Sequence, residues 1–285
     1  MSDLRIATRG SALAMAQAEW VSAALVATHP GLIVSMVEVR TVGDRDLSSP
    51  VSVLTEVGAF VRAVQRAVVE EEADLAVHSC KDLPVGGPSL LTTFFPERAA
   101  PWDVLCGHDL NSLPLEARVG TGSPRRAAQM RLLRPDVEVE EIRGNVDTRL
   151  AKLRAGEYDA VVLAEAGLSR LGRETEMRHR FDVTEMVPAP AQGALAVEAL
   201  NGSQAAEIAR SIDHEATRRA VEAERALLAH TRAGCRSALG AVASVAGPEI
   251  RLTGFAEDES GPRFGDAVGT DPEVVARELQ SVLGL

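Results

Sequence analysis

The sequence predicts an α/β protein with two lobes around a cleft, followed by a small α+β domain. Strands and helices alternate between residues 4 and 77 and again between residues 118 and 163, which is the pattern of sheets with parallel strand pairs. A proline-rich return at residues 188–193 indicates a hinge between the lobes. Beyond residue 213 the pattern changes to a long helix, strands and a closing helix, which predicts a separate third domain.

The first alternation has expected strands at residues 4–8, 32–39 and 74–77 and expected helices at 12–27 and 59–70. Ser11 is a favourable N-cap for the first helix. The stretch 41–57 mixes Gly, Asp, Ser and Pro without helical period, so it predicts a long loop. The third strand runs into the segment 78–84, and the carboxyl end of a parallel strand is where α/β sheets bind ligands.

The rest of the chain has expected strands at 118–121, 137–142, 160–163, 238–245 and 250–256 and expected helices at 124–133, 147–155, 215–229 and 272–282. Ser123 followed by Pro124 is a helix start signal, because the hydroxyl can cap the helix and proline suits its first turn.

Composition excludes several classes of protein. The 285 residues are 46% hydrophobic and 25% charged, which fits two or three folded domains and no long disordered tract. The sequence contains no apolar run of the roughly 20 residues that span a membrane, and the amino end lacks the pattern of a signal peptide. We therefore expect a cytoplasmic protein that binds no membrane. The three widely spaced cysteines form no CxxC pair, so no disulfide framework and no metal site is expected.

The net charge of −11 disfavours nucleic-acid binding, but one segment reverses the sign. Residues 118–154 carry eight arginines and one lysine against five acids, a local excess of +4. A basic island in an acidic chain indicates a pocket for a small polyanion.

Asp82 follows a strand and lies beside Lys81, so it is a candidate proton shuttle, although a solvated turn acid would have the same local sequence. His78 is more simply explained as a buried residue at a strand end. Cys235 follows Gly234 in a small-residue turn, where a thiol is accessible enough to carry a covalent group; a small buried side chain is the alternative.

Arginines stand at the start of an expected helix or close to the end of a strand, where their planar forks could clamp carboxylates. Those in question are Arg125, Arg126, Arg143 and Arg149. Composition alone leaves open whether they bind a ligand or are solvated charges.

Taken together, these segments resemble the porphobilinogen deaminase family. The resemblance covers nearly the whole chain, and its specificity comes from the order and spacing of several motifs. They are RIATRGS (5–11), ADLAVHSCKDLP (73–84), GTGSPRR (120–126), RGNVDTRL (143–150), YDAVVLA (158–164), AGLSRLG (166–172), QGA (192–194) and GC (234–235).

The resemblance implies two periplasmic-binding-protein-like α/β lobes around a cleft and a third domain whose cysteine carries a dipyrromethane cofactor as a thioether. The implied domains are residues 1–97 with 193–213, residues 98–192, and residues 214–285. The implied reaction joins four porphobilinogen molecules head to tail with loss of ammonia, and water then releases hydroxymethylbilane. A monomer without nucleic-acid partners is expected.

The resemblance also assigns roles to individual residues. Asp82 would be the catalytic acid and base, and Cys235 would carry the cofactor. Residues expected to contact the cofactor are Lys81, Thr121, Ser123, Arg125, Arg126, Arg149 and Gln192. Residues expected to contact the substrate are Arg9, Ser11, Phe60, Arg143, Arg149 and Arg170.

The sequence departs from the family pattern at four places, one of which is 121–126, where TGSPRR replaces the usual TSSLRR. The other three are as follows. The segment 57–65 has lost both lysines and both acids of the usual pattern, 190–193 reads PAQG, and the turn 233–240 lacks the usual proline. Two alternatives to an active enzyme therefore stay open: an inactive paralogue, or a non-catalytic protein that binds a carboxylated small molecule. A thiol enzyme that uses Cys80 is a weaker one, because no histidine partner can be assigned.

Overall fold

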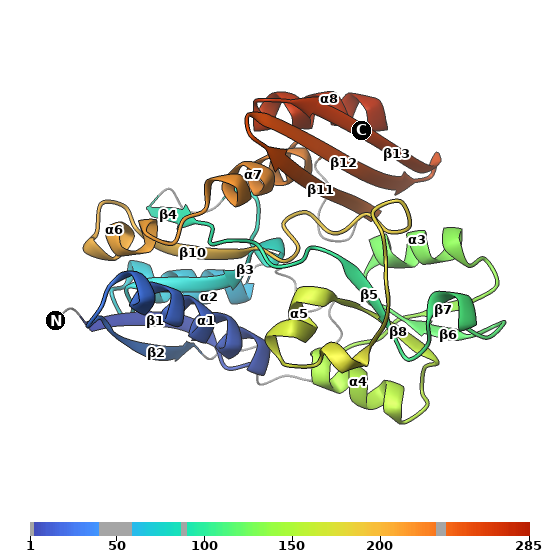
Figure 1. Ribbon diagram of the computed structural model, residues 1–285, viewed down its shortest axis with the longest axis horizontal. Helices are drawn as coiled ribbons and strands as arrows, with labels where there is room; N and C mark the ends of the chain where they lie inside the picture. The colour runs from blue at the N-terminus through green and yellow to red at the C-terminus, as the bar shows by residue number, and fades with distance from the viewer. Residues whose placement is uncertain (1–2, 40–58, 87–89, 232–237) are drawn as a thin grey trace. The chain divides into compact units, whose positions relative to one another are not determined.

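The computed structural model describes residues 3–39, 59–86, 90–231 and 238–285, and the chain forms two compact units (Figure 1). Unit 1 comprises Met1–Arg98 and Ala194–Arg218, and unit 2 comprises Ala99–Gly193 and Arg219–Leu285. The chain therefore leaves unit 1, returns to it after residue 193 and leaves it again within a helix.

Unit 1 contains a five-stranded sheet of mixed type with the order β2-β1-β3-β10-β4. Its strands are β1 (Asp3–Arg9), β2 (Ile33–Val39), β3 (Leu75–Ser79), β4 (Leu91–Phe94) and β10 (Leu195–Leu200). Its helices are α1 (Ala12–Thr28), α2 (Ala59–Val69) and α6 (Gln204–Arg210). β1 pairs in parallel with β2 and β3, whereas β10 runs antiparallel to β3 and β4.

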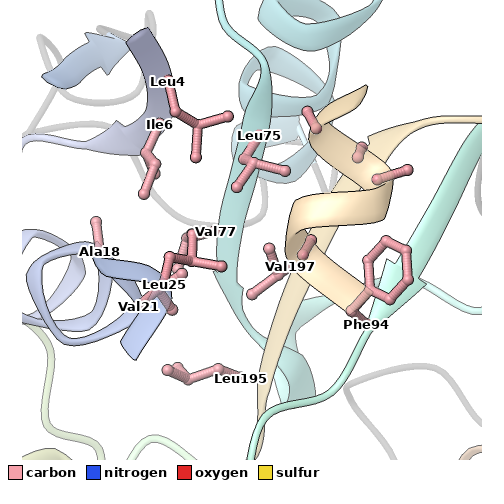
Figure 2. Packing of buried hydrophobic residues seen from close by; sticks show 14 residues of the cluster. Leu4, Ile6, Ala18, Val21, Leu25, Leu75, Val77, Phe94, Leu195 and Val197 are labelled. Carbon is pink, nitrogen blue, oxygen red and sulfur yellow. The ribbon is translucent and has the colours of Figure 1, made fainter. Parts of the chain in front are cut away.

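Helices cover both faces of this sheet, so its central strands are mostly apolar on both sides. Figure 2 shows one face, where Leu75 and Val77 of β3 meet Val21 and Leu25 of α1. On the other face Ala76 packs with apolar residues of α2. Burying a valine or leucine fully stabilises the fold by about 1.5–3 kcal/mol, so these two layers fix β3 between them.

Unit 2 contains a second five-stranded sheet with the order β7-β6-β8-β5-β9. Its strands are β5 (Asp103–Cys106), β6 (Arg118–Gly120), β7 (Glu138–Glu140), β8 (Ala160–Ala164) and β9 (Met177–Arg180). Its helices are α3 (Pro124–Leu133), α4 (Val146–Arg154) and α5 (Glu165–Arg170). Ser123 caps α3 and Asn145 caps α4, each by accepting a backbone N–H.

The carboxyl-terminal part of unit 2 is an antiparallel sheet with the order β11-β12-β13. Its elements are α7 (Glu215–His230), β11 (Ala238–Ala246), β12 (Glu249–Asp258), β13 (Gly261–Gly269) and α8 (Pro272–Leu283). One face of the sheet packs on α7 and α8. On the other face Val242 and Phe255 meet Ala128 of α3, so this sheet packs on the arginine-bearing part of the chain.

The predicted α/β fold class is confirmed. Each predicted strand and helix in the described residues is present, most with shifted ends, and the helix predicted at 124–133 has those bounds. Strand 137–142 is the most altered, since β7 covers only Glu138–Glu140. The sequence reading missed β4, β5, β9, β10, β13, α5 and α6. The predicted loop 41–57 and the predicted turn 233–235 lie outside the described residues. The division into three domains stays a prediction.

Candidate functional site

Asp82 lies in a one-turn 3-10 helix, Cys80–Asp82, directly after β3. The turn is anchored on both sides of Asp82, because Cys80 and Leu83 are buried. The Cys80 N–H donates to the carbonyl of Ala194, directly before β10, at 3.0 Å, and the Leu83 N–H donates to the Cys80 carbonyl at 3.1 Å. The carboxyl of Asp82 is exposed between these anchors. A fixed backbone with an accessible carboxyl is the arrangement that acid–base catalysis needs.

The cysteines in the described residues are not accessible nucleophiles. Cys80 and Cys106 are both fully buried. The pKa of the Cys106 thiol is raised to about 12, mainly by burial. The burial of Cys80 speaks against the thiol-enzyme alternative. Cys235 lies outside the described residues.

Arg9 and Phe60 form a pair in unit 1. The guanidinium carbon of Arg9, at the end of β1, lies 4.1 Å from the centroid of the Phe60 ring near the start of α2. This is a cation–π contact, which orients the guanidinium. Ser11 is the predicted N-cap of α1, and its Oγ accepts the Ala14 N–H at 3.3 Å. Lys81 is half-buried in the same turn as Asp82.

In unit 2, Asp103 is a fully buried carboxylate at the start of β5 that holds two arginines. Arg125 Nη1 donates to one oxygen at 2.7 Å, and Arg126 Nε donates to the other at 2.9 Å. Burial alone would raise the pKa of Asp103, but the charges of Arg125 and Arg126 outweigh burial and lower it well below its usual range. The carboxylate offsets only one of the two cations.

Gln192 completes this cluster. Its Nε2 donates to Asp103 Oδ1 at 2.9 Å and to the Pro101 carbonyl at 2.7 Å, and the residue is 1% exposed. Gln192 Oε1 lies 3.5 Å from Arg126 Nη2, which donates to it. The predicted contact residues Arg125, Arg126 and Gln192 are therefore brought together around a residue that sequence reasoning missed.

Thr121 and Ser123 shape the start of α3. Thr121 is buried, and its Oγ1 accepts the Ser123 N–H at 3.2 Å. Ser123 Oγ accepts the Arg126 N–H at 3.4 Å. Both hydroxyls thus support the backbone that carries the buried arginines.

Arg149 and Arg170 have no carboxylate partner within the described ranges. Arg149 Nε donates to the Gly144 carbonyl at 2.8 Å, and Arg170 Nη2 donates to the Gly193 carbonyl at 2.7 Å. Burial lowers the pKa of Arg149, and the nearby charge of Arg126 lowers it further. Burial lowers the pKa of Arg170 to about 10. These guanidiniums are short of negative charge, which a carboxylated ligand would supply.

Arg143 differs from the other arginines. It is exposed and pairs with Glu141, with 2.8 Å between Nε and Oε1. This pair lowers the pKa of Glu141. Arg143 therefore already has a carboxylate that a ligand would have to displace.

The sequence around Asp103 contains a pattern from which a buried ion pair could have been predicted. Asp103 is an acid directly before the apolar run Val104-Leu105-Cys106, and an acid at the start of a buried strand requires a cation.

Within the described ranges no group of His, Cys, Asp or Glu is placed to hold a metal ion. No helix in that part of the chain has the length and apolarity to cross a membrane.

Comparisons with known proteins identify relatives across most of the chain. The family model described as "Porphobilinogen deaminase, dipyromethane cofactor binding domain" matches residues 4–208. The porphobilinogen deaminase of Acidothermus cellulolyticus is 47% identical over 270 residues, which cover 92% of this chain and 81% of the relative. That of Roseiflexus castenholzii is 45% identical over 259 residues, covering 89% of this chain and 86% of the relative.

Solved structures give weaker similarity. The periplasmic VFT2 domain of Bordetella pertussis BvgS aligns with a TM-score of 0.42 and 15% identity, covering 74% of this chain and 86% of that chain.

Proposed function

The chain belongs to the porphobilinogen deaminase family, and on this premise we propose that it condenses four porphobilinogen molecules head to tail, with loss of ammonia, and releases hydroxymethylbilane by hydrolysis. The observation that carries the proposal is the excess of buried positive charge in unit 2. Arg126 shares its carboxylate partner with a second arginine, and Arg149 and Arg170 have no carboxylate partner within the described ranges. Each pyrrole of the substrate brings two carboxylates.

The same residues fit a dipyrromethane cofactor, because its acetate and propionate groups match guanidinium donors. Arg126 and Arg149, with Gln192 beside them, would hold its carboxylates, and Thr121 and Ser123 would support that backbone. When bound as a thioether at Cys235, the cofactor supplies the pyrrole carbon from which the product chain grows. Attachment at Cys235 is proposed from the sequence, since that residue lies outside the described ranges.

Asp82 would move the protons of the reaction. As an acid it would donate a proton to the aminomethyl nitrogen of porphobilinogen, which then leaves as ammonia. As a carboxylate it would stabilise positive charge on the pyrrole nitrogen and accept the ring proton after the carbon–carbon bond has formed. Its exposed position in an anchored turn supports this role.

Arg9, Phe60, Ser11 and Lys81 would bind the substrate and cofactor from unit 1. Arg9 is oriented by the Phe60 ring and is the best placed of them to clamp a carboxylate. Arg143 would exchange Glu141 for a substrate carboxylate. The predicted cytoplasmic location and monomeric state stay predictions.

The test is the rate of porphobilinogen consumption by Asp82→Asn. We expect a loss of about 10²–10⁴-fold, which is the usual contribution of a general acid–base group, with the cofactor still attached. The control is Asp3→Asn, since Asp3 is exposed at the start of β1 and outside the site. An unchanged rate in Asp82→Asn would remove Asp82 from the mechanism.

A further inference from the structure

A polar cluster lies inside unit 1 on residues that the proposed chemistry does not use. Glu198 of β10, Gln65 of α2 and His78 of β3 are 3%, 3% and 7% exposed. In the antiparallel register, Glu198 lies opposite Ala76 and His78 lies opposite Ala196. Ala76 packs against α2, so the cluster belongs to the layer between the sheet and that helix. The same layer is otherwise built from small and apolar side chains.

The Gln65 amide joins the helix to the sheet. Its Nε2 donates to both carboxylate oxygens of Glu198, at 3.1 Å to Oε1 and 2.9 Å to Oε2. His78 Nε2 lies 3.1 Å from Glu198 Oε2, although its ring is not aligned to form a hydrogen bond there. Thr93 of β4 makes a long contact of 3.5 Å with Oε1. One carboxylate thus contacts α2, β3 and β4.

Two of these elements carry residues of the proposed site. β3 ends at Ser79, and the turn with Asp82 follows directly. α2 carries Phe60 near its first turn, beneath Arg9. A shift of α2 along β3 would therefore move Phe60 relative to Asp82.

Apolar packing alone would not prevent that shift, because hydrophobic contacts are not directional. A buried carboxylate costs free energy unless it is paired, and apolar groups of similar volume often stabilise a fold better. Directional hydrogen bonds, by contrast, fix register. We propose that Glu198 is a positioning residue that sets the register of α2 on β3 and thereby the position of Asp82 relative to Phe60. This inference rests on the proposed function for the role of Asp82.

Gln65→Met is the first variant. Methionine retains the side-chain volume and helix propensity of glutamine but removes both donors to Glu198. We expect kcat to fall by about 10- to 100-fold with a smaller change in KM, since a displaced acid–base group slows the chemical step. The variant also leaves a buried carboxylate without its amide, so its thermal unfolding midpoint should fall.

The double variant Gln65→Met/Glu198→Leu separates positioning from stability. It removes the buried charge together with its partner, so the unfolding midpoint should return toward the wild-type value. If Glu198 positions α2, kcat stays low in the double variant. If the cluster only stabilises the fold, kcat recovers with the midpoint, and the proposal is overturned. Glu198→Gln, which keeps one acceptor, should have an intermediate kcat.

Hydrogen exchange of the backbone amides in residues 79–83 gives a readout that needs no turnover. We expect faster exchange there in the double variant than in wild type at matched global stability. Equal exchange would contradict the proposal whatever the activity. Gln280→Met, at a half-buried helical glutamine of α8, is the matched control and should change neither kcat nor this exchange. A wild-type protein that consumes no porphobilinogen would refute the proposed function, while exchange would still decide the role of Glu198.

Discussion

At the scale of single residues, Asp103 explains why two arginines lie inside the protein. Arg125 and Arg126 are 3% and 6% exposed, a burial that a guanidinium tolerates only with a carboxylate and carbonyl acceptors. Arg125 also donates to the Val187 carbonyl at 2.7 Å, and Arg126 donates to the Val162 carbonyl at 3.0 Å. Both guanidiniums are therefore held by acceptors inside unit 2. We infer that the pair carries one surplus positive charge, close to Arg149, that a carboxylated ligand would neutralise.

Asp103→Asn should destabilise the protein strongly. The variant leaves two buried guanidiniums without an anion, and breaking a buried pair in this way costs about 3–5 kcal/mol. Urea unfolding at neutral pH measures the effect. As a control, Asp258→Asn removes an exposed partner of Arg263 and should leave the urea midpoint close to that of wild type, because exposed ion pairs contribute little to stability. Equal midpoints for Asp103→Asn and wild type would contradict the assignment.

The same pair predicts a pH dependence. The pKa of Asp103 is lowered in the folded state. The ionised carboxylate therefore contributes its full stabilisation above the ordinary pKa of an aspartate, about 3.9. That contribution is lost as pH falls from there toward the lower folded-state pKa. The difference in unfolding free energy between wild type and Asp103→Asn should therefore be constant from pH 5 to 7, as linkage requires, and shrink below about pH 4. A difference that grows on acidification would refute this account.

The candidate site shows where residue patterns were sufficient. The capping role of Ser123 was predicted from its neighbours in sequence and is confirmed. The place of Asp82 directly after a strand was predicted in the same way, while its catalytic role stays a prediction. The hub at Asp103 was not, because its partners Arg125, Arg126 and Gln192 lie 22, 23 and 89 residues away. The Glu198 cluster was missed for the same reason, since Gln65 is 133 residues from Glu198.

At the scale of elements, helix α4 carries two arginines of opposite character. Arg149 is half-buried, has a lowered pKa and lacks a carboxylate in the described part of the chain. Arg154, in the last turn, is exposed and pairs with Glu176. The helix therefore presents one cation to a ligand and uses the other in an ordinary surface pair.

Arg149→Met should weaken cofactor or substrate capture without loss of stability. Losing a charged hydrogen-bond donor is expected to raise KM, or to lower the fraction of protein that carries cofactor, by about 10- to 100-fold. The unfolding midpoint of the cofactor-free protein should not fall, because the removed cation was opposed by burial and by Arg126. Arg154→Met is the control on the same helix and should retain both properties. Normal loading and KM in Arg149→Met would count against the carboxylate-binding role.

Helices with local start signals were predictable, whereas several strands were not. α1 and α3 begin at capping serines that a reader of the sequence can find. β10 has no such local signal. Its place in the sheet comes from antiparallel pairing with β3, in which Val197 lies opposite Val77, a residue far away in the sequence. β13 is mostly polar or glycine along its length and forms a strand because β12 pairs with it throughout.

At the scale of the whole molecule, the chain builds each compact unit from separated segments. β10 and α6 of unit 1 follow, in the sequence, all five strands of the larger sheet of unit 2. The carboxyl-terminal sheet packs on α3 through Val242 and Phe255, so β11, which follows Cys235 in the sequence, belongs to the same unit as the arginine cluster. Alternation of strands and helices predicted the α/β class, but it could not predict this return, which depends on pairing between distant strands.

The central claim is that this chain carries a covalent pyrrole cofactor on Cys235 and extends it with porphobilinogen. The most direct test is the intact mass of the purified wild-type chain beside Cys235→Ala, with Cys106→Ala as the control that removes a buried thiol. The account predicts a mass increment of two linked pyrrole units in wild type and in Cys106→Ala, and none in Cys235→Ala. A wild-type chain that is unmodified, and that gains no mass when incubated with porphobilinogen, would contradict it.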